Sequence, residues 1–196
     1  MYSTKTAVFS SDNNYLPAGI NNDVTLKEVN VKTTPNGIDY LEIIFQKDGN
    51  TAPMTEWQNK KSVWIKTDED LQYRDNLQFG RILQVINAIC DEPVGDVELN
   101  DFSSMIKWVK DTLSPKINAQ KLLRLKVVYD KNGFIKVSSN GKFIEPMDVK
   151  QEDSKIVITG RDTVVKPEIK VDKEEVVELP KVNDTKESAG DEDLPF

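Results

Sequence analysis

The spacing of hydrophobic residues changes twice along the chain, and this pattern restricts the folds that the sequence can adopt. Residues 22–58 and 121–138 alternate between apolar and polar side chains, as β-strands do, whereas residues 68–113 repeat with a helical period. The sequence therefore predicts two groups of strands separated by a helical insert.

The first predicted strand contains a break in its alternation. Val24 and Leu26 fall on one face, but Val29 and Val31 fall on the opposite face. One extra residue in a strand, a β-bulge, produces such a slip and bends the strand. Turn sequences containing Gly and Asn then separate three strands, predicted over residues 22–33, 39–46 and 52–58.

Two helices and a hairpin follow these strands. Pro93 and Gly95 end the first helix, and Pro115 ends the second. The turn 130–133 joins two further strands. The predicted elements are helices over 68–90 and 101–113, strands over 121–129 and 134–138, and a short extended piece over 156–159.

This order of elements is that of a five-stranded Greek-key barrel, the OB-fold, with residues 68–113 as a helical insert. A bent first strand suits this mainly-β fold, because that strand has to pair at both ends of the barrel. A different small barrel or an α+β sandwich fits the same order. We expect the domain to span residues 20–165, after an irregular lead-in over 1–19 and before a disordered acidic tail over 166–196.

Histidine is absent and Cys90 is the only cysteine, which excludes most catalytic and metal-binding chemistry. A Ser-His-Asp or Cys-His nucleophile, a His- or Cys-based metal site and a disulfide are all ruled out. We therefore expect neither an enzyme nor a cofactor, and Glu42 with Glu56 would be the best pair for carboxylate chemistry. Without an apolar run of about 20 residues or a signal-peptide pattern, we expect a cytoplasmic protein that does not contact membranes.

Charge is distributed unevenly along the chain, whose net charge is −7. Residues 1–150 contain 19 Lys and Arg against 20 Asp and Glu, whereas residues 151–196 contain 7 against 13. Residues 105–150 alone carry 10 basic and 4 acidic side chains. This asymmetry predicts a polyanionic partner for the basic part and a separate role for the acidic part.

Basic and aromatic side chains are interleaved in the strands predicted over 121–129 and 134–138. If Leu123 and Leu125 face the core, Arg124 and Lys126 face outward. Single-stranded nucleic acid needs such a surface, because cations contact phosphates and exposed rings stack on bases. Lysines on the solvent face of any half-buried strand would give the same pattern. The candidate residues are Arg124, Lys126, Tyr129, Lys131, Phe134, Lys136 and Lys142.

A second group of candidates follows the third strand, where two tryptophans stand among three lysines: Trp57, Lys60, Lys61, Trp64 and Lys66. Either tryptophan could form a stacking platform. We expect Trp57 at the binding face and Trp64, which has aliphatic neighbours, in the core. Arg74 and Arg81 on the first helix could extend the surface, although their spacing is equally that of a solvated helix face.

The most specific sequence signal is the ending Asp191-Glu192-Asp193-Leu194-Pro195-Phe196. A terminal Phe combines a large apolar ring with a free carboxylate, so a pocket with a basic rim can bind both. Pro195 stiffens the approach, and the acids attract basic partners. The alternative is a solubilising tail that ends in this way by chance.

This ending resembles the acidic tip of bacterial single-stranded DNA-binding proteins, in which acids precede an aliphatic residue, Pro and Phe. A barrel followed by an acidic tail is similar to those proteins and to the single-stranded DNA-binding proteins of tailed bacteriophages. Residues 16–57 also resemble the N-terminal barrel part of the phage proteins. The two-helix insert and the lack of a long Gly-, Gln- and Pro-rich linker depart from the bacterial pattern and leave the oligomeric state open.

The resemblance implies a sequence-independent single-stranded DNA-binding protein of phage DNA replication, recombination and repair. It implies that the barrel holds DNA through aromatic and basic side chains. It also implies that residues 191–196 recruit a replication protein such as a polymerase, helicase, primase or nuclease. The alternative is a barrel that binds protein and scaffolds a replication complex through the same tail. The two alternatives differ in their response to salt, because only the affinity for DNA has to fall steeply as the salt concentration rises.

Overall fold

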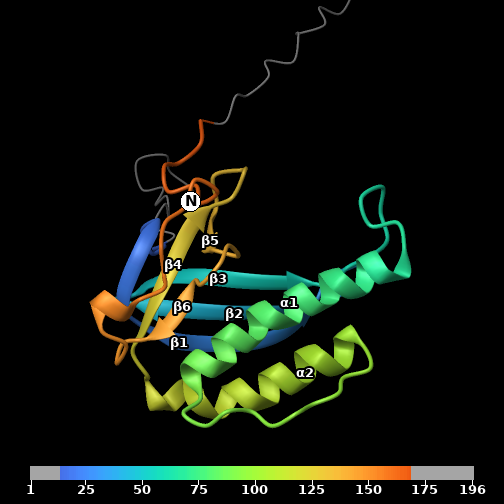
Figure 1. The fold of residues 1–196 in the computed structure, drawn as a ribbon, viewed down its shortest axis with the longest axis horizontal. Coiled ribbons are helices and arrows are strands. Elements are labelled where there is room, and N and C mark those ends of the chain that lie inside the picture. The colour runs from blue at the N-terminus through green and yellow to red at the C-terminus, as the bar shows by residue number, and fades with distance from the viewer. Residues whose placement is uncertain (1–13, 169–196) are drawn as a thin grey trace, which may run out of the picture.

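Residues 14–168 are described by the computed structural model, and they form a mainly-β unit with two long helices (Figure 1). An antiparallel sheet runs in the order β3-β2-β1-β4-β5, and the short strand β6 also pairs with β4. The strands are β1 Gly19–Thr33, β2 Asp39–Lys47, β3 Asn50–Trp57, β4 Leu123–Tyr129, β5 Ile135–Val137 and β6 Ile144–Pro146. The helices are α1 Asp68–Ile89 and α2 Phe102–Leu113, with short 3-10 turns at Ser114–Ala119 and Gln151–Asp153.

The bulge predicted in the first strand is confirmed. The register of β1 against β2 shifts between Leu26 and Glu28, so Leu26 and Val29 are both buried. β1 pairs with β4 through its N-terminal half and with β2 through its C-terminal half. The bulge and a second irregularity near Asp23, whose φ of 58° lies in the left-handed region, bend β1 enough to join both parts of the sheet.

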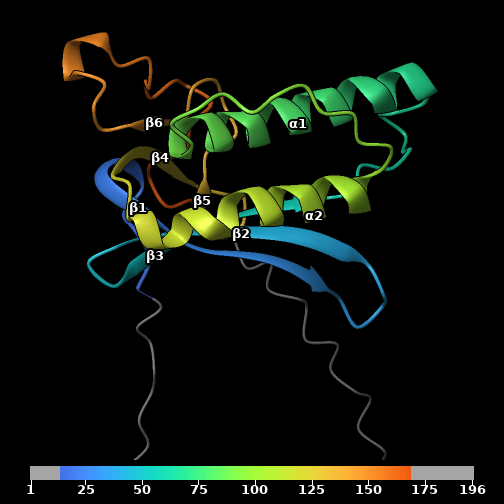
Figure 2. The same ribbon diagram turned by 90° about the horizontal axis from the view of Figure 1, so that it is seen from below.

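The hydrophobic core lies between the two helices and the inner face of the sheet, to which β4–β6 contribute as well as β1–β3 (Figure 2). β2 buries Leu41, Ile43 and Phe45, as its alternation predicts. Thr67 and Asp101 cap the two helices, whose buried stripes include Ile82, Val85, Ile86, Ile89, Met105, Ile106, Val109 and Leu113. The outer face of β1–β3 is covered by no helix or strand from residues 14–168 (Figure 2).

The sheet is open within the described residues. Its two end strands, β3 and β5, form no ladder with each other. A cleft of about 420 Å³ lies between them. The predicted mainly-β fold with a helical insert is therefore confirmed, whereas a closed barrel is not.

The chain after β5 folds differently from the prediction. Residues 156–159 form no strand, and Ile144–Pro146 pairs with β4 instead. A three-residue strand that ends in proline has no recognisable alternation, so the sequence does not reveal it. Residues 138–163, which we call the cover segment, include β6 at the edge of β4, and their Asn140, Val157 and Asp162 contact Lys126 on the outer face of β4. Both faces of β4 are buried as a result.

The two ends of the chain extend beyond residues 14–168. Of the predicted lead-in, Leu16 is buried and its N–H donates to the Thr51 carbonyl at 2.9 Å, next to the start of β3. The predicted acidic tail lies outside the described residues from 169 onward. Nowhere in residues 14–168 is a helix both long and apolar enough to cross a membrane.

Candidate nucleic-acid interface

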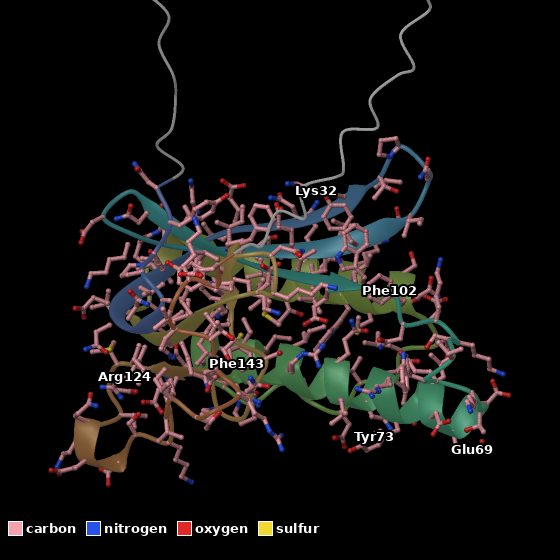
Figure 3. The ribbon with its side chains drawn as sticks, turned by 90° about the horizontal axis from the view of Figure 1, so that it is seen from above. Lys32, Glu69, Tyr73, Phe102, Arg124 and Phe143 are labelled. Carbon is pink, nitrogen blue, oxygen red and sulfur yellow. The ribbon has the colours of Figure 1, made fainter. Side chains whose placement is uncertain are left out.

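The outer face of β1–β3 presents a pair of stacked aromatic rings, of which one is exposed and the other half-buried. Strand pairing places Lys32 beside Tyr40 and Tyr40 beside Trp57. The two rings stack with centroids 4.3 Å apart and planes inclined by 23°. Trp57 is 46% exposed, which confirms the prediction that it faces outward. We call Lys32, Tyr40 and Trp57 the aromatic row, and Figure 3 shows Lys32 on the side of the sheet that faces away from α1 and α2.

A polar row lies next to the aromatic row on the same face. The pairing places Asn30 beside Glu42 and Glu42 beside Thr55. The Lys32 ammonium donates to Glu42 across the two rows, and this hydrogen bond raises the pKa of Lys32 above its usual value. The ammonium of the aromatic row therefore stays charged at neutral pH. The alternation of β2 already indicates that Tyr40 faces outward, because Leu41 and Ile43 face the core.

Glu42 and Glu56 do not form the carboxylate pair considered above. Glu42 lies on the outer face, whereas Glu56 pairs with Leu41 and is buried on the inner face. Glu56 accepts hydrogen bonds from Arg81 Nε at 3.2 Å, Arg81 Nη2 at 2.9 Å and Gln78 Nε2 at 2.7 Å. Arg81 thus neutralises a buried acid, while its own side chain stays partly exposed and lines the cleft between β3 and β5.

The loop between β3 and α1, residues 58–67, carries Trp64 at its tip, and we call it the Trp64 loop. Ser62 and Ile65 exchange backbone hydrogen bonds of 3.0 and 3.2 Å, which closes a tight turn around Val63 and Trp64. Trp64 is 86% exposed and Val63 is 77% exposed. The prediction that Trp64 lies in the core is wrong, because the turn leaves both side chains in solvent.

The lysines around this loop differ in their surroundings. Lys60 and Lys66 are exposed, and Arg74 is exposed on α1. Lys61 is also exposed but forms an ion pair with Asp68 at 2.7 Å. Lys60, Lys66 and Arg74 therefore remain the candidates for phosphate contacts near Trp64.

Arg124 is buried, which contradicts the prediction that it faces outward. It forms an ion pair with Glu145 of β6, which is buried as well. Its Nε donates to Asn22 Oδ1 at 3.1 Å. The alternation of β4 is as predicted, but the cover segment lies on the face that was expected to be solvated.

Lys126 is buried for the same reason, so it does not face outward either, and it is only 1% exposed. Its ammonium donates to Asp162 Oδ2 at 3.0 Å and to the carbonyls of Asn140 at 2.8 Å and Val157 at 3.0 Å. Three acceptors satisfy the three N–H bonds of the ammonium. Lys126 therefore holds the cover segment on β4 and is not available to phosphate.

The acid partner of Lys126 is also fully satisfied. Burial alone would raise the pKa of Asp162, but hydrogen bonds from the Thr159 backbone, Lys126 and Ser138 outweigh it and hold that pKa well below its usual value. The Ser138 hydroxyl donates at 2.8 Å and the Thr159 N–H at 2.9 Å. Asp162 is therefore ionised wherever the protein is folded near neutral pH.

The predicted basic surface is accessible to solvent only around the hairpin between β4 and β5, among the residues that the structure describes on these two strands. Asp130 Oδ1 accepts hydrogen bonds from the N–H groups of Asn132 at 2.8 Å and Phe134 at 2.9 Å, which fix the turn. Phe134 is 65% exposed. The other predicted residues here are exposed or half-buried: Lys131, Lys136, Tyr129 and Lys142.

The cleft between β3 and β5 connects this hairpin to the strand face. Residues 53–56 of β3 form one wall, and residues 135–139 form the other. Thr55 of the polar row and Lys136 of β5 both line it. The structure thus brings the hairpin and the outer face of β3 to one cleft, while the Trp64 loop and Arg74 do not line it.

Two further predictions concern metal ions and the acidic tip. In the part of the chain that the structure describes, no group of three or more His, Cys, Asp or Glu residues could hold a metal ion. The predicted partner-binding tip, Asp191–Phe196, lies outside residues 14–168. The candidate interface therefore consists of the aromatic row, the Trp64 loop and the β4–β5 hairpin. In comparisons with known proteins, no family model and no curated protein matches the chain.

Proposed function

We propose that the protein binds single-stranded DNA without sequence specificity, in phage DNA replication or recombination. The observation that carries this proposal is the aromatic row. Tyr40 and Trp57 stack on an exposed strand face beside a charged lysine, although no part of residues 14–168 packs over them as a core would. Exposed rings next to cations are what a single strand needs, since bases stack and phosphates pair with cations.

We also propose that the sheet is an OB-type barrel that is open between β3 and β5. The order β3-β2-β1-β4-β5 supports this proposal, because closing β3 on β5 would give the Greek-key order of that barrel. OB-folds bind oligonucleotides on strands 2 and 3, between the loops that follow strands 1 and 4. Tyr40 of β2, Trp57 of β3 and Phe134 of the β4–β5 loop occupy the corresponding places.

Fewer cations are free to contact DNA than the sequence predicts. Arg81, Arg124 and Lys126 are each bound to a carboxylate inside the protein. Single strands lose affinity with a slope of about −0.7 in log K against log salt for each phosphate neutralised. About four contacts, from residues such as Lys60, Lys66, Lys131 and Lys136, would give a slope of about −3.

Titration of a fluorescein-labelled dT20 oligonucleotide at several NaCl concentrations tests the proposal. We expect binding that quenches tryptophan fluorescence, because bases stack on Trp57, and an affinity that falls steeply as salt rises. An affinity that does not depend on salt, or no binding at low salt, would contradict the proposal.

A protein-binding scaffold is the second candidate function, and the exposed tip of the Trp64 loop favours it. Tryptophan is enriched in protein-binding hot spots, and Val63 adds apolar area beside it. A scaffold would bind its protein partner about equally well with and without oligonucleotide present. The same titration distinguishes the two functions, because a scaffold shows no salt-dependent DNA binding.

Replacing Trp64 with Ala is expected to change the free energy of unfolding by less than about 0.5 kcal/mol, as at other exposed positions. The reason is that 86% of the residue is exposed at the tip of a turn. Urea denaturation followed by circular dichroism measures this effect. A destabilisation of about 3 kcal/mol, typical of a buried tryptophan, would show that the side chain packs in the core in solution.

We further propose that Asp191–Phe196 recruits replication proteins, as the resemblance implies. Deleting Phe196 is expected to abolish recruitment but to leave oligonucleotide affinity almost unchanged, because the acidic charges remain. Deleting residues 191–196 should leave that affinity equal or modestly higher, most clearly at low salt, where charge repulsion is least screened. Pull-down with purified replication proteins and oligonucleotide titration measure the two effects. Loss of DNA binding in either deletion would contradict the separation of roles.

A further inference from the structure

We propose that Glu42 biases the DNA-binding face toward bases that carry an exocyclic amino group, and against thymine and uracil. This inference rests on the proposed function and adds to it a modest base preference. It concerns the polar row, which stacking and phosphate contacts do not use.

The position of Glu42 carries the first step. Glu42 and Tyr40 are two residues apart in β2 and face the same side, so their Cα atoms are separated by about 7 Å. Thr55 has the same relation to Trp57 in β3. A base that stacks on the aromatic row therefore has its edge within reach of the polar row.

The chemistry of the carboxylate carries the second step. Lys32 donates to Oε2 of Glu42, and Oε1 has no hydrogen-bond partner among the described residues. An ionised carboxylate accepts hydrogen bonds and cannot donate them. The 4-amino group of cytosine can donate to Oε1, whereas thymine and uracil present the O4 acceptor at that position. Where Oε1 faces the 4-position of the base and not the neighbouring N3–H, repulsion between O4 and the carboxylate disfavours these two bases.

Lys32 allows an acid to lie on a DNA-binding face. Its ammonium neutralises Glu42, so the pair does not repel the phosphate backbone as a free carboxylate would. A pair that only stabilised the sheet across its strands would have no effect on base preference. The dependence of affinity on the base distinguishes these two roles.

The experiment compares the affinities for dC15 and dU15. Their bases differ only at the base-pairing edge, because uracil, unlike thymine, has no 5-methyl group. We expect Glu42→Gln to lower the ratio of dC15 to dU15 affinity about fivefold relative to the wild type. Glutamine can donate to O4 as well as accept from the amino group, so the discrimination is lost. Glu42→Ala, which removes both groups, should lower the ratio to a similar extent.

Glu28→Gln is the matched control. Glu28 lies on the same face beside Ile44 and accepts from Asn30 Nδ2 at 3.0 Å, but it is one row further from the aromatic row than Glu42. Loss of its charge should change affinity for both oligonucleotides equally and leave the ratio unchanged. Fluorescence anisotropy at one fixed salt concentration measures all of these affinities.

The outcomes separate this inference from the proposed function. If the wild type binds neither oligonucleotide, the proposed function fails. If the wild type binds both and Glu42→Gln keeps the wild-type ratio, only the inference about Glu42 is overturned. A ratio that falls equally in Glu28→Gln would also overturn it, because the effect would then come from general charge.

Discussion

Replacing Lys126 with Met is expected to lower the free energy of unfolding by about 3–5 kcal/mol, the usual effect of breaking a buried ion pair by removing one partner. The variant leaves the Asp162 carboxylate buried without its ammonium and removes the donor from two backbone carbonyls. Many domains of this size have only about 5–15 kcal/mol of stability, so the loss would be easily detected. Urea denaturation followed by circular dichroism measures it.

The destabilisation should depend on pH in a defined direction. In the wild type, Asp162 has a lowered pKa, so it stabilises the fold above its unfolded pKa of about 3.9 and loses this effect only as pH falls through the folded value. Without Lys126 the folded pKa rises, and protonation relieves the unpaired charge. The difference in unfolding free energy between wild type and variant should therefore shrink between pH 7 and about pH 4.

Two controls make this prediction specific to the buried pair. Lys150 lies 4.0 Å from Glu152, and both side chains are exposed, so Lys150→Met should change the free energy of unfolding by less than about 1 kcal/mol. Combining Lys126→Met with Asp162→Asn should recover part of the loss, because no unpaired charge remains. Equal effects of Lys126→Met and Lys150→Met would show that the cover segment does not bury Lys126 in solution.

The parts of the fold that depend on local pattern could be predicted from the sequence. The bulge in β1 follows from the positions of Val24, Leu26 and Val29, and the buried face of β2 follows from its alternation. The caps and apolar stripes of α1 and α2 are local as well, and their predicted bounds differ from the observed ones by one residue. Each of these features is encoded within a few neighbouring residues.

The burial of β4 could not be predicted, because it depends on residues far along the chain. Arg124 and Lys126 alternate with leucines, which is the pattern of a strand with one solvated face. Their partners Glu145 and Asp162 lie 21 and 36 residues later, in a segment without a clear period. A sequence does not show that two cations are buried until their acceptors are known.

The candidate site was predictable in part. Trp57 was expected outside and is outside, because its parity in β3 is opposite to that of the buried Met54 and Glu56. Trp64 was misassigned, since aliphatic neighbours indicate a core position but do not reveal a tight turn. Tyr40 could have been found from alternation alone, but its stacking on Trp57 depends on the register between two strands.

Replacing Trp57 with Ala is expected to weaken binding to single-stranded DNA by about 1–3 kcal/mol, the usual contribution of one stack between a base and an aromatic ring. The ring is exposed and contacts Tyr40, so its removal takes away one of the two rings of the aromatic row without opening a cavity in the core. The free energy of unfolding should therefore change little. Anisotropy titration with labelled dT20 and urea denaturation measure the two quantities on the same protein.

The choice of controls decides what a loss of affinity means. Trp57→Phe should retain most of the DNA affinity, because it keeps a ring on the outer face of β3. Lys66→Met should remove a phosphate contact, so it should lower the DNA affinity and make that affinity depend less steeply on salt. Trp108, which lies near Phe79 between the helices with centroids 5.9 Å apart, offers a tryptophan outside the interface, and Trp108→Phe should leave DNA affinity unchanged. Suppose instead that Trp57→Ala binds DNA as tightly as the wild type while Trp64→Ala loses DNA affinity. The bound DNA must then follow the Trp64 loop, and the aromatic row would not be the binding surface.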